Sequence, residues 1–144
     1  MRLRAEPKAL YRSIALNLPQ GPHFMARVLL VEDEVSVLIL AESVVQGLGH
    51  KTLSAATMTE ALNLFKNVGP IDALFVDIRL PEGDLAGLEL AQQAVEQNAS
   101  LRVLYTTGQI ATDGMKSMFV EGSLFLSKPY TVTEMTRAFK ELLA

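Results

Sequence analysis

The sequence of 144 residues contains no cysteine, so disulfide bonds and thiolate metal sites are excluded, and nothing argues for an oxidising compartment. No apolar run reaches the roughly 18 to 20 residues that a membrane helix requires. Residues 1–24 also lack the apolar core and the cleavage site of a signal peptide. We therefore expect a cytoplasmic protein without a membrane segment.

Positive charge is scarce over most of the chain. The formal net charge is −3, but residues 1–24 hold four basic side chains and one acid, which leaves 9 basic and 15 acidic side chains on the rest. A protein that binds DNA or RNA needs clustered lysine and arginine to contact phosphates. Direct binding of nucleic acid is therefore not expected.

Hydrophobic residues make up 49% of the chain and charged residues 20%, a balance typical of one compact α/β domain. From residue 27 onward, short apolar runs alternate with segments of helical period, which is typical of a parallel sheet covered by helices. This alternation predicts a doubly wound, five-stranded parallel sheet in a three-layer α/β sandwich. The expected strands are residues 27–31, 51–54, 73–76, 102–106 and 123–126.

Two of the expected helices have a marked start. Thr57 with Glu60, and Thr131 with Glu134, have the spacing of a capping box, in which side chain and backbone amide satisfy each other reciprocally. The segment 111–120 has only a loose apolar pattern and predicts a short helix.

Residues 1–24 lie outside this alternation, behind a cluster of proline and glycine at 19–22. Their apolar spacing permits a short amphipathic helix. Met25 stands just before the first strand, however, so the segment is equally an extension from an upstream start site. The predicted units are an appendage over 1–24 and a domain over 25–144.

The residues that follow or end the strands carry the chemistry, because a ligand binds an open α/β sheet beyond the carboxyl ends of its strands. Each of these residues has an ordinary explanation as a helix cap, a turn residue or a loop lysine, but none of those explains their convergence. Crowded carboxylates need a cation, and Mg²⁺ suits carboxylate oxygens and bridges to phosphate. The set predicts Mg²⁺-dependent phosphoryl transfer to an aspartate. It consists of Glu32, Asp33, Asp77, Thr107 and Lys128.

Four segments in this order and spacing resemble the receiver domain of two-component response regulators, and the likeness runs from about residue 27 to the C-terminus. The resemblance implies a flavodoxin-like strand order of 2-1-3-4-5 and a role in phosphorelay signalling. It also implies a phosphoacceptor that assists only its own phosphorylation and dephosphorylation, rather than an enzyme. The segments are residues 29–34, 76–81 followed by 87–90, 105–108 and 127–130.

The resemblance implies a role for each site residue. Asp77 would accept the phosphoryl group, and Thr107 and Lys128 would hold phosphoryl oxygens. Glu32 would assist Mg²⁺ binding through water. The implied metal ligands are therefore Glu32, Asp33, Asp77 and the main-chain carbonyl of Arg79.

The resemblance also implies switch and tuning positions. Thr107 and Phe125 would be the switch residues, although Phe125 equally fits a plain core residue of the fifth strand. Arg79 and Gln109 fall where family members tune the lifetime of the phosphorylated form. The loop over residues 82–86 is longer than is usual in the family, which leaves its contacts with a kinase open.

The implied phosphoryl donor is a histidine kinase or a histidine phosphotransfer protein. No effector domain follows Ala144 in this sequence, so we expect output through a protein that binds the face of the fourth helix, fifth strand and fifth helix. The oligomeric state stays open, a homodimer included.

Two other classes of function stay open. One is a phosphorylation-independent interaction module on the same fold. The other is a flavoprotein or phosphatase, since doubly wound sheets host many functions. The acids at 32–34 are opposite to what a flavin phosphate would need. His23 and His50 are isolated from the acids, and we do not expect them to be ligands.

Overall fold

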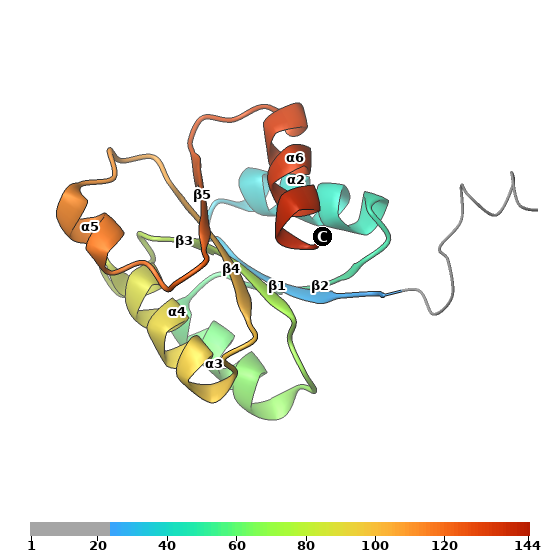
Figure 1. The fold of residues 1–144 in the computed structure, drawn as a ribbon, viewed down its shortest axis with the longest axis horizontal. Helices are drawn as coiled ribbons and strands as arrows, with labels where there is room; N and C mark the ends of the chain where they lie inside the picture. The colour runs from blue at the N-terminus through green and yellow to red at the C-terminus, as the bar shows by residue number, and fades with distance from the viewer. Residues whose placement is uncertain (1–23) are drawn as a thin grey trace, which may run out of the picture.

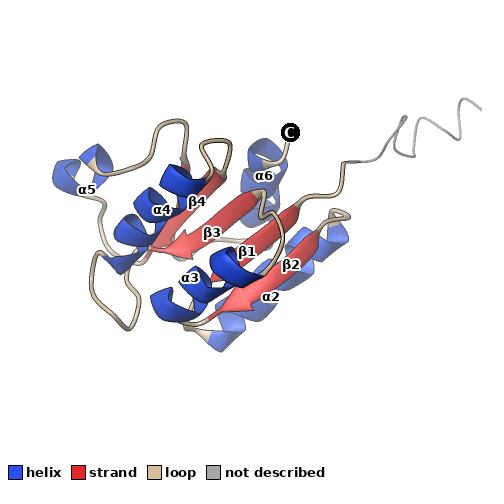
Figure 2. Ribbon diagram, turned by 90° about the horizontal axis from the view of Figure 1, so that it is seen from below, coloured by secondary structure: helices blue, strands red, loops and turns tan. Residues whose placement is uncertain are grey.

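The computed structural model describes residues 24–144, which form one parallel sheet covered by helices on both faces (Figures 1 and 2). The strand order is β2-β1-β3-β4-β5, as predicted. Helices α2 and α6 cover one face, and α3, α4 and α5 cover the other. The strands are β1 (Arg27–Val31), β2 (Lys51–Ala55), β3 (Ala73–Asp77), β4 (Arg102–Thr107) and β5 (Leu124–Ser127), and the helices are α2 (Val35–Gly47), α3 (Met58–Asn67), α4 (Ala86–Gln97), α5 (Asp113–Ser117) and α6 (Val132–Leu142).

The strands differ from the predicted ranges by at most one residue at each end. β3 and β4 each continue one residue further than predicted, because Asp77 pairs with Thr106 and Thr107 pairs with Ser127. Two of the predicted site residues are therefore the last residues of strands, where ladder hydrogen bonds fix their backbone. The predicted appendage, except for Phe24, lies outside the described residues.

The core has two halves, one on each face of the sheet. Leu29 and Val31 pack toward α3 and α4, whereas Val28 and Leu30 pack toward α2 and α6. Every residue of the central strand β3 is buried. This is the environment expected of a parallel strand covered on both faces.

The two predicted capping boxes differ in the structure. Thr131 and Glu134 form both reciprocal bonds, at 3.1 and 2.8 Å. At the start of α3, Thr57 accepts from the Glu60 amide, but the Glu60 carboxylate accepts from the amide of Ala56. The box predicted there is wrong in its second half, because Glu60 extends one residue further back.

The segment 111–120 forms a short helix, as predicted. α5 has five residues, begins at a Thr112 cap and buries only Met115. Among the described residues, none of the helices is long and apolar enough to cross a membrane.

Gly87 allows α4 to pack against the end of β3. Its amide donates to the carbonyl of Ile78 at 2.8 Å. A Cβ at this position would lie 2.1 Å from the carbonyl oxygen of Asp77 and 2.7 Å from the Cα of Ile78. Any side chain there would therefore force α4 away from the strand that carries Asp77.

We predict that Gly87→Ala lowers the free energy of unfolding by about 1 to 3 kcal/mol, because the added methyl group overpacks a backbone contact. Gly47→Ala is the matched control, since Gly47 is the last residue of α2 and nothing lies within 4 Å of a Cβ built there. The control should be neutral or slightly stabilising. Urea denaturation of both variants measures the difference, and equal stabilities would contradict the packing argument.

Candidate functional site

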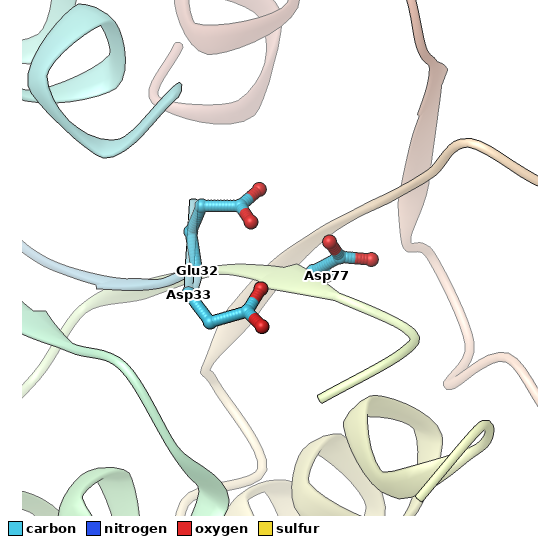
Figure 3. Close-up of side chains that lie close together, drawn as sticks. All are labelled: Glu32, Asp33 and Asp77. Atoms are coloured by element: carbon cyan, nitrogen blue, oxygen red, sulfur yellow. The ribbon is translucent and has the colours of Figure 1, made fainter. Parts of the chain in front are cut away.

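Three carboxylates gather at the carboxyl ends of the neighbouring strands β1 and β3 (Figure 3). Glu32 and Asp33 follow β1, and Asp77 ends β3, which is its neighbour in the sheet. One oxygen from each residue lies within 4.8 Å of the others. Glu32 and Asp77 are buried, whereas Asp33 is exposed. Adjacent parallel strands thus bring together acids that are 44 residues apart in the chain.

Lys128 reaches this cluster from the end of β5. Its backbone amide donates to the carbonyl of Thr107 at 2.9 Å, which fixes where the side chain starts. Its Nζ lies 2.9 Å from Oε1 of Glu32, Oε1 of Glu34 and Oδ2 of Asp77. The side chain is only 15% exposed, so these carboxylates are the main partners of the ammonium.

The contact between Glu34 and Lys128 could not be predicted from the sequence. The run of acids at 32–34 includes Glu34, but no local pattern assigns this residue a partner. Its side chain turns back toward β5, a contact over 94 residues that no local pattern indicates.

The charges of the site are unbalanced in favour of the acids. Burial raises the pKa of Glu32 to about 7, although contacts with Lys128 and the Glu34 amide act in the opposite direction. Burial would lower the pKa of Lys128, but its bonds to Glu34, Glu32 and Asp77 outweigh burial and raise it. Four acidic side chains, Glu32, Asp33, Glu34 and Asp77, thus share the site with one lysine. Since hard divalent cations prefer carboxylate oxygens, Glu32, Asp33 and Asp77 could hold a metal ion.

Asp77 is held by two donors. Its Oδ1 accepts from the Arg79 amide at 3.2 Å, and its Oδ2 accepts from Lys128 at 2.9 Å. The residue is 6% exposed. It lines a cleft of about 510 Å³ that is open to solvent, so an incoming group has room to reach its carboxylate.

Thr107 lines the same cleft as Asp77 and Lys128. Its hydroxyl accepts from the amide of Gln109 at 3.2 Å, the hydroxyl-mediated turn that is one ordinary explanation of this residue. The side chain is therefore positioned at the cleft, and its O–H can still donate to a bound oxygen.

Arg79 and Gln109 meet at the mouth of the cleft. We assign the Gln109 amide with its oxygen toward Arg79, because that oxygen then accepts from Nε at 3.1 Å and from Nη2. The guanidinium also pairs with Asp84, at 3.3 Å. The two predicted tuning positions are thus in direct contact.

Phe125 lies on β5, outside the cleft. It is 36% exposed and pairs in register with Tyr105. The ring of Phe119 stacks on both, with centroids 4.4 Å from Tyr105 and 5.8 Å from Phe125. The predicted switch residue therefore ends an aromatic stack that starts two residues before Thr107.

The long loop after β3 is fixed to helix α3. The carboxylate of Glu82 accepts from the amides of Met58 and Thr59, at 2.9 and 3.1 Å, and from the Thr59 hydroxyl. Leu80 and Gly83 also form an antiparallel bridge. The sequence did not indicate this attachment, because its partners lie 24 residues away.

His50 accepts from the amide of Ala26 at 2.9 Å, at the opposite end of β1 from the acids. His23 lies outside the described residues. His50 lies away from the acidic cluster, and the prediction that neither histidine is a ligand stays a prediction.

The family model of the response regulator receiver domain matches residues 28–140. The aerobic respiration control sensor protein ArcB of Escherichia coli is 32% identical over 79% of this chain and 15% of that protein. Sporulation initiation phosphotransferase F of Bacillus subtilis is 26% identical over 81% of this chain and 93% of that protein. A crystal structure of a response regulator receiver protein from Sinorhizobium medicae has a TM-score of 0.74 and 27% identity, over 83% of this chain and 94% of that one.

Other curated relatives are longer. The chain spans 12%, 49% and 45% of the length of three of them, a sensor kinase and two transcriptional regulatory proteins. The likeness therefore concerns one domain of those proteins.

We predict that Lys128→Met lowers the free energy of unfolding by about 3 kcal/mol near neutral pH, because Glu32 and Asp77 lose the cation that compensates their buried charge. The folded-state pKa of Glu32 is already raised, so at about pH 5 Glu32 is mostly protonated and the loss should be smaller than at about pH 8. Lys66→Met, at an exposed position of α3, is the control. Denaturant unfolding at both pH values measures this, and an equal loss at both would contradict the charge argument.

Proposed function

Because the chain belongs to the response regulator receiver family, we propose that it acts in two-component phosphorelay signalling by accepting a phosphoryl group on Asp77. One observation carries the proposal: the Asp77 carboxylate lies at an open cleft, 2.9 Å from the ammonium of Lys128 and beside two further acids. Phosphoryl transfer needs positioning and charge stabilisation, and these groups supply both.

The proposed step forms a bond between a carboxylate oxygen of Asp77 and phosphorus. The bond from phosphorus to the donor's histidine nitrogen breaks, and that nitrogen keeps the electron pair and takes a proton. The donor is a histidine kinase or a histidine phosphotransfer protein. Attack of water on phosphorus later releases inorganic phosphate and restores the carboxylate, so the chain assists only its own modification.

Lys128 and Thr107 would bind the oxygens of the phosphoryl group. The ammonium offers charge and N–H donors, and the hydroxyl of Thr107 offers a further donor at the same cleft. Both side chains start from strand ends whose backbones are bonded to each other, which keeps the two donors in fixed relation.

Mg²⁺ is the metal that we propose for the acidic cluster. Glu32, Asp33, Asp77 and the main-chain carbonyl of Arg79 would hold it, with Glu32 acting through water. The bound ion would supply positive charge that lets an anionic phosphoryl group approach the acids. The excess of carboxylates over ammonium groups supports this proposal.

We propose that the signal leaves the site through Thr107 and Phe125. A phosphoryl group that draws Thr107 toward it would strain the end of β4, and Tyr105 lies two residues earlier in that strand. The aromatic stack of Tyr105, Phe119 and Phe125 leads from there to the surface. A protein partner would bind the face of α5, β5 and α6, and the location would be the cytoplasm.

The first test is labelling with acetyl phosphate. We predict that Mg²⁺ and acetyl phosphate add one phosphoryl group to the wild-type protein, and that Asp77→Asn abolishes the addition because the amide cannot form the acyl phosphate. Asp113→Asn, an exposed acid of α5, should label normally. Intact mass spectrometry measures all three, and labelling of Asp77→Asn at the wild-type level would refute the proposal.

The second test concerns the metal. We predict that Mg²⁺ stabilises the folded protein, by about 2.7 kcal/mol at a hundredfold excess over its Kd, because the ion binds only the folded cluster. Asp33→Asn should weaken this effect, while Asp72→Asn, whose carboxylate instead accepts from the Arg27 amide, should keep it. Thermal unfolding during a Mg²⁺ titration measures it. An unchanged melting temperature in the wild type would argue against the ion.

A further inference from the structure

Glu34 occupies an unusual position for an acid at a helix start. It is the N-cap residue of α2, yet its side chain makes no capping bond. Its amide donates to Oε2 of Glu32 at 3.0 Å, and its carboxylate accepts from Lys128 at 2.9 Å. The Glu34 side chain therefore binds Lys128 and does not cap helix α2.

Lys128 has as many carboxylate neighbours as it has N–H bonds. An ammonium has three donors, and Glu32, Glu34 and Asp77 each place one oxygen at 2.9 Å from Nζ. The contacts to Glu34 and Asp77 are hydrogen bonds, and the contact to Glu32 is an ion pair. A phosphoryl oxygen that enters the cleft must compete with these carboxylates for the ammonium. Binding of a phosphoryl group at Lys128 should therefore weaken at least one of these three contacts.

The exposures of the three side chains decide which partner yields. Glu32 is fully buried and Asp77 is 8% exposed, so neither can turn to water without rearranging the strand ends. Glu34 is 61% exposed and lines the cleft beside Asp77 and Thr107. Its carboxylate can move into solvent at little cost, since an exposed ion pair contributes little to stability.

We propose that Glu34 is a positioning residue that holds the Lys128 ammonium in the resting protein and releases it when a phosphoryl group binds at Asp77. This inference rests on the proposed function. Since the release opposes phosphoryl binding, Glu34 weakens the affinity of the resting cleft for phosphoryl-like anions. Loss of the contact should therefore strengthen their binding.

Three variants separate this contact from other effects of the residue. Glu34→Gln removes the charge, and Glu34→Asp keeps the charge but is one methylene too short to keep the contact with Lys128. Glu42→Gln makes the same change of charge further along α2, where the carboxylate accepts from Ser54. The probe is beryllofluoride, a phosphoryl mimic, titrated at saturating Mg²⁺ into the full chain.

We expect Glu34→Gln and Glu34→Asp both to lower the half-saturating concentration of beryllofluoride by about two- to fivefold, the effect of losing one exposed ion pair. Glu42→Gln should match the wild type. The measurement is the amide NMR shift of Thr107, which reports binding without any turnover, and the melting temperature of each variant checks the fold.

Either of two results would overturn the inference. Equal affinities in all four proteins would mean that Glu34 does not compete for Lys128. A gain in Glu34→Gln with wild-type affinity in Glu34→Asp would mean that only the general field of the charge matters. A wild-type protein that neither binds beryllofluoride nor labels at Asp77 would instead refute the proposed function, and the inference with it.

Discussion

The ammonium of Lys128, 2.9 Å from Oδ2 of Asp77, is the interaction on which the site depends. The acids at the ends of β1 and β3, whose oxygens lie within 4.8 Å of one another, would repel each other if no cation lay nearby. The lysine at the end of β5 compensates part of that charge and connects this strand, across β4, to the adjacent strands β1 and β3. Because four acidic side chains share the site with one lysine, the same arrangement that stabilises the resting site could also hold a divalent cation.

The sheet determines that these groups meet. Parallel strands place all their carboxyl ends at one edge, and the order β2-β1-β3-β4-β5 puts β1 beside β3 at the point where the chain reverses its winding. Packing then sets the finer position of Asp77. Gly87 brings α4 against the backbone of this residue, so the helix supports the strand end at which the proposed chemistry takes place.

The fold and the reacting groups could be predicted from the sequence because both depend on local patterns. Alternating apolar segments define the strands, and Asp77, Thr107 and Lys128 stand at strand ends, where the topology alone brings them together. The other contacts depend on how far a side chain extends across the fold. Glu34 bonds to Lys128 over 94 residues, and Glu82 bonds to the start of α3 over 24. No spacing rule encodes such distances, so only coordinates reveal them.

The aromatic stack of Tyr105, Phe119 and Phe125 lies beside the short helix α5, which has only five residues. α5 buries only Met115, whereas the segment that follows it packs against the core through Met118, Phe119 and Val120. The Val120 amide donates to the Tyr105 hydroxyl at 3.1 Å, and the Gln92 side chain donates to the Met118 carbonyl at 3.1 Å. Tyr105 belongs to the same strand as Thr107, and Phe125 carries the stack to the surface. Under the proposed switch, a movement of the β4 end would meet little resistance from the short helix α5 and would shift the exposed ring of Phe125. A long, well-buried helix at this position would oppose such a movement.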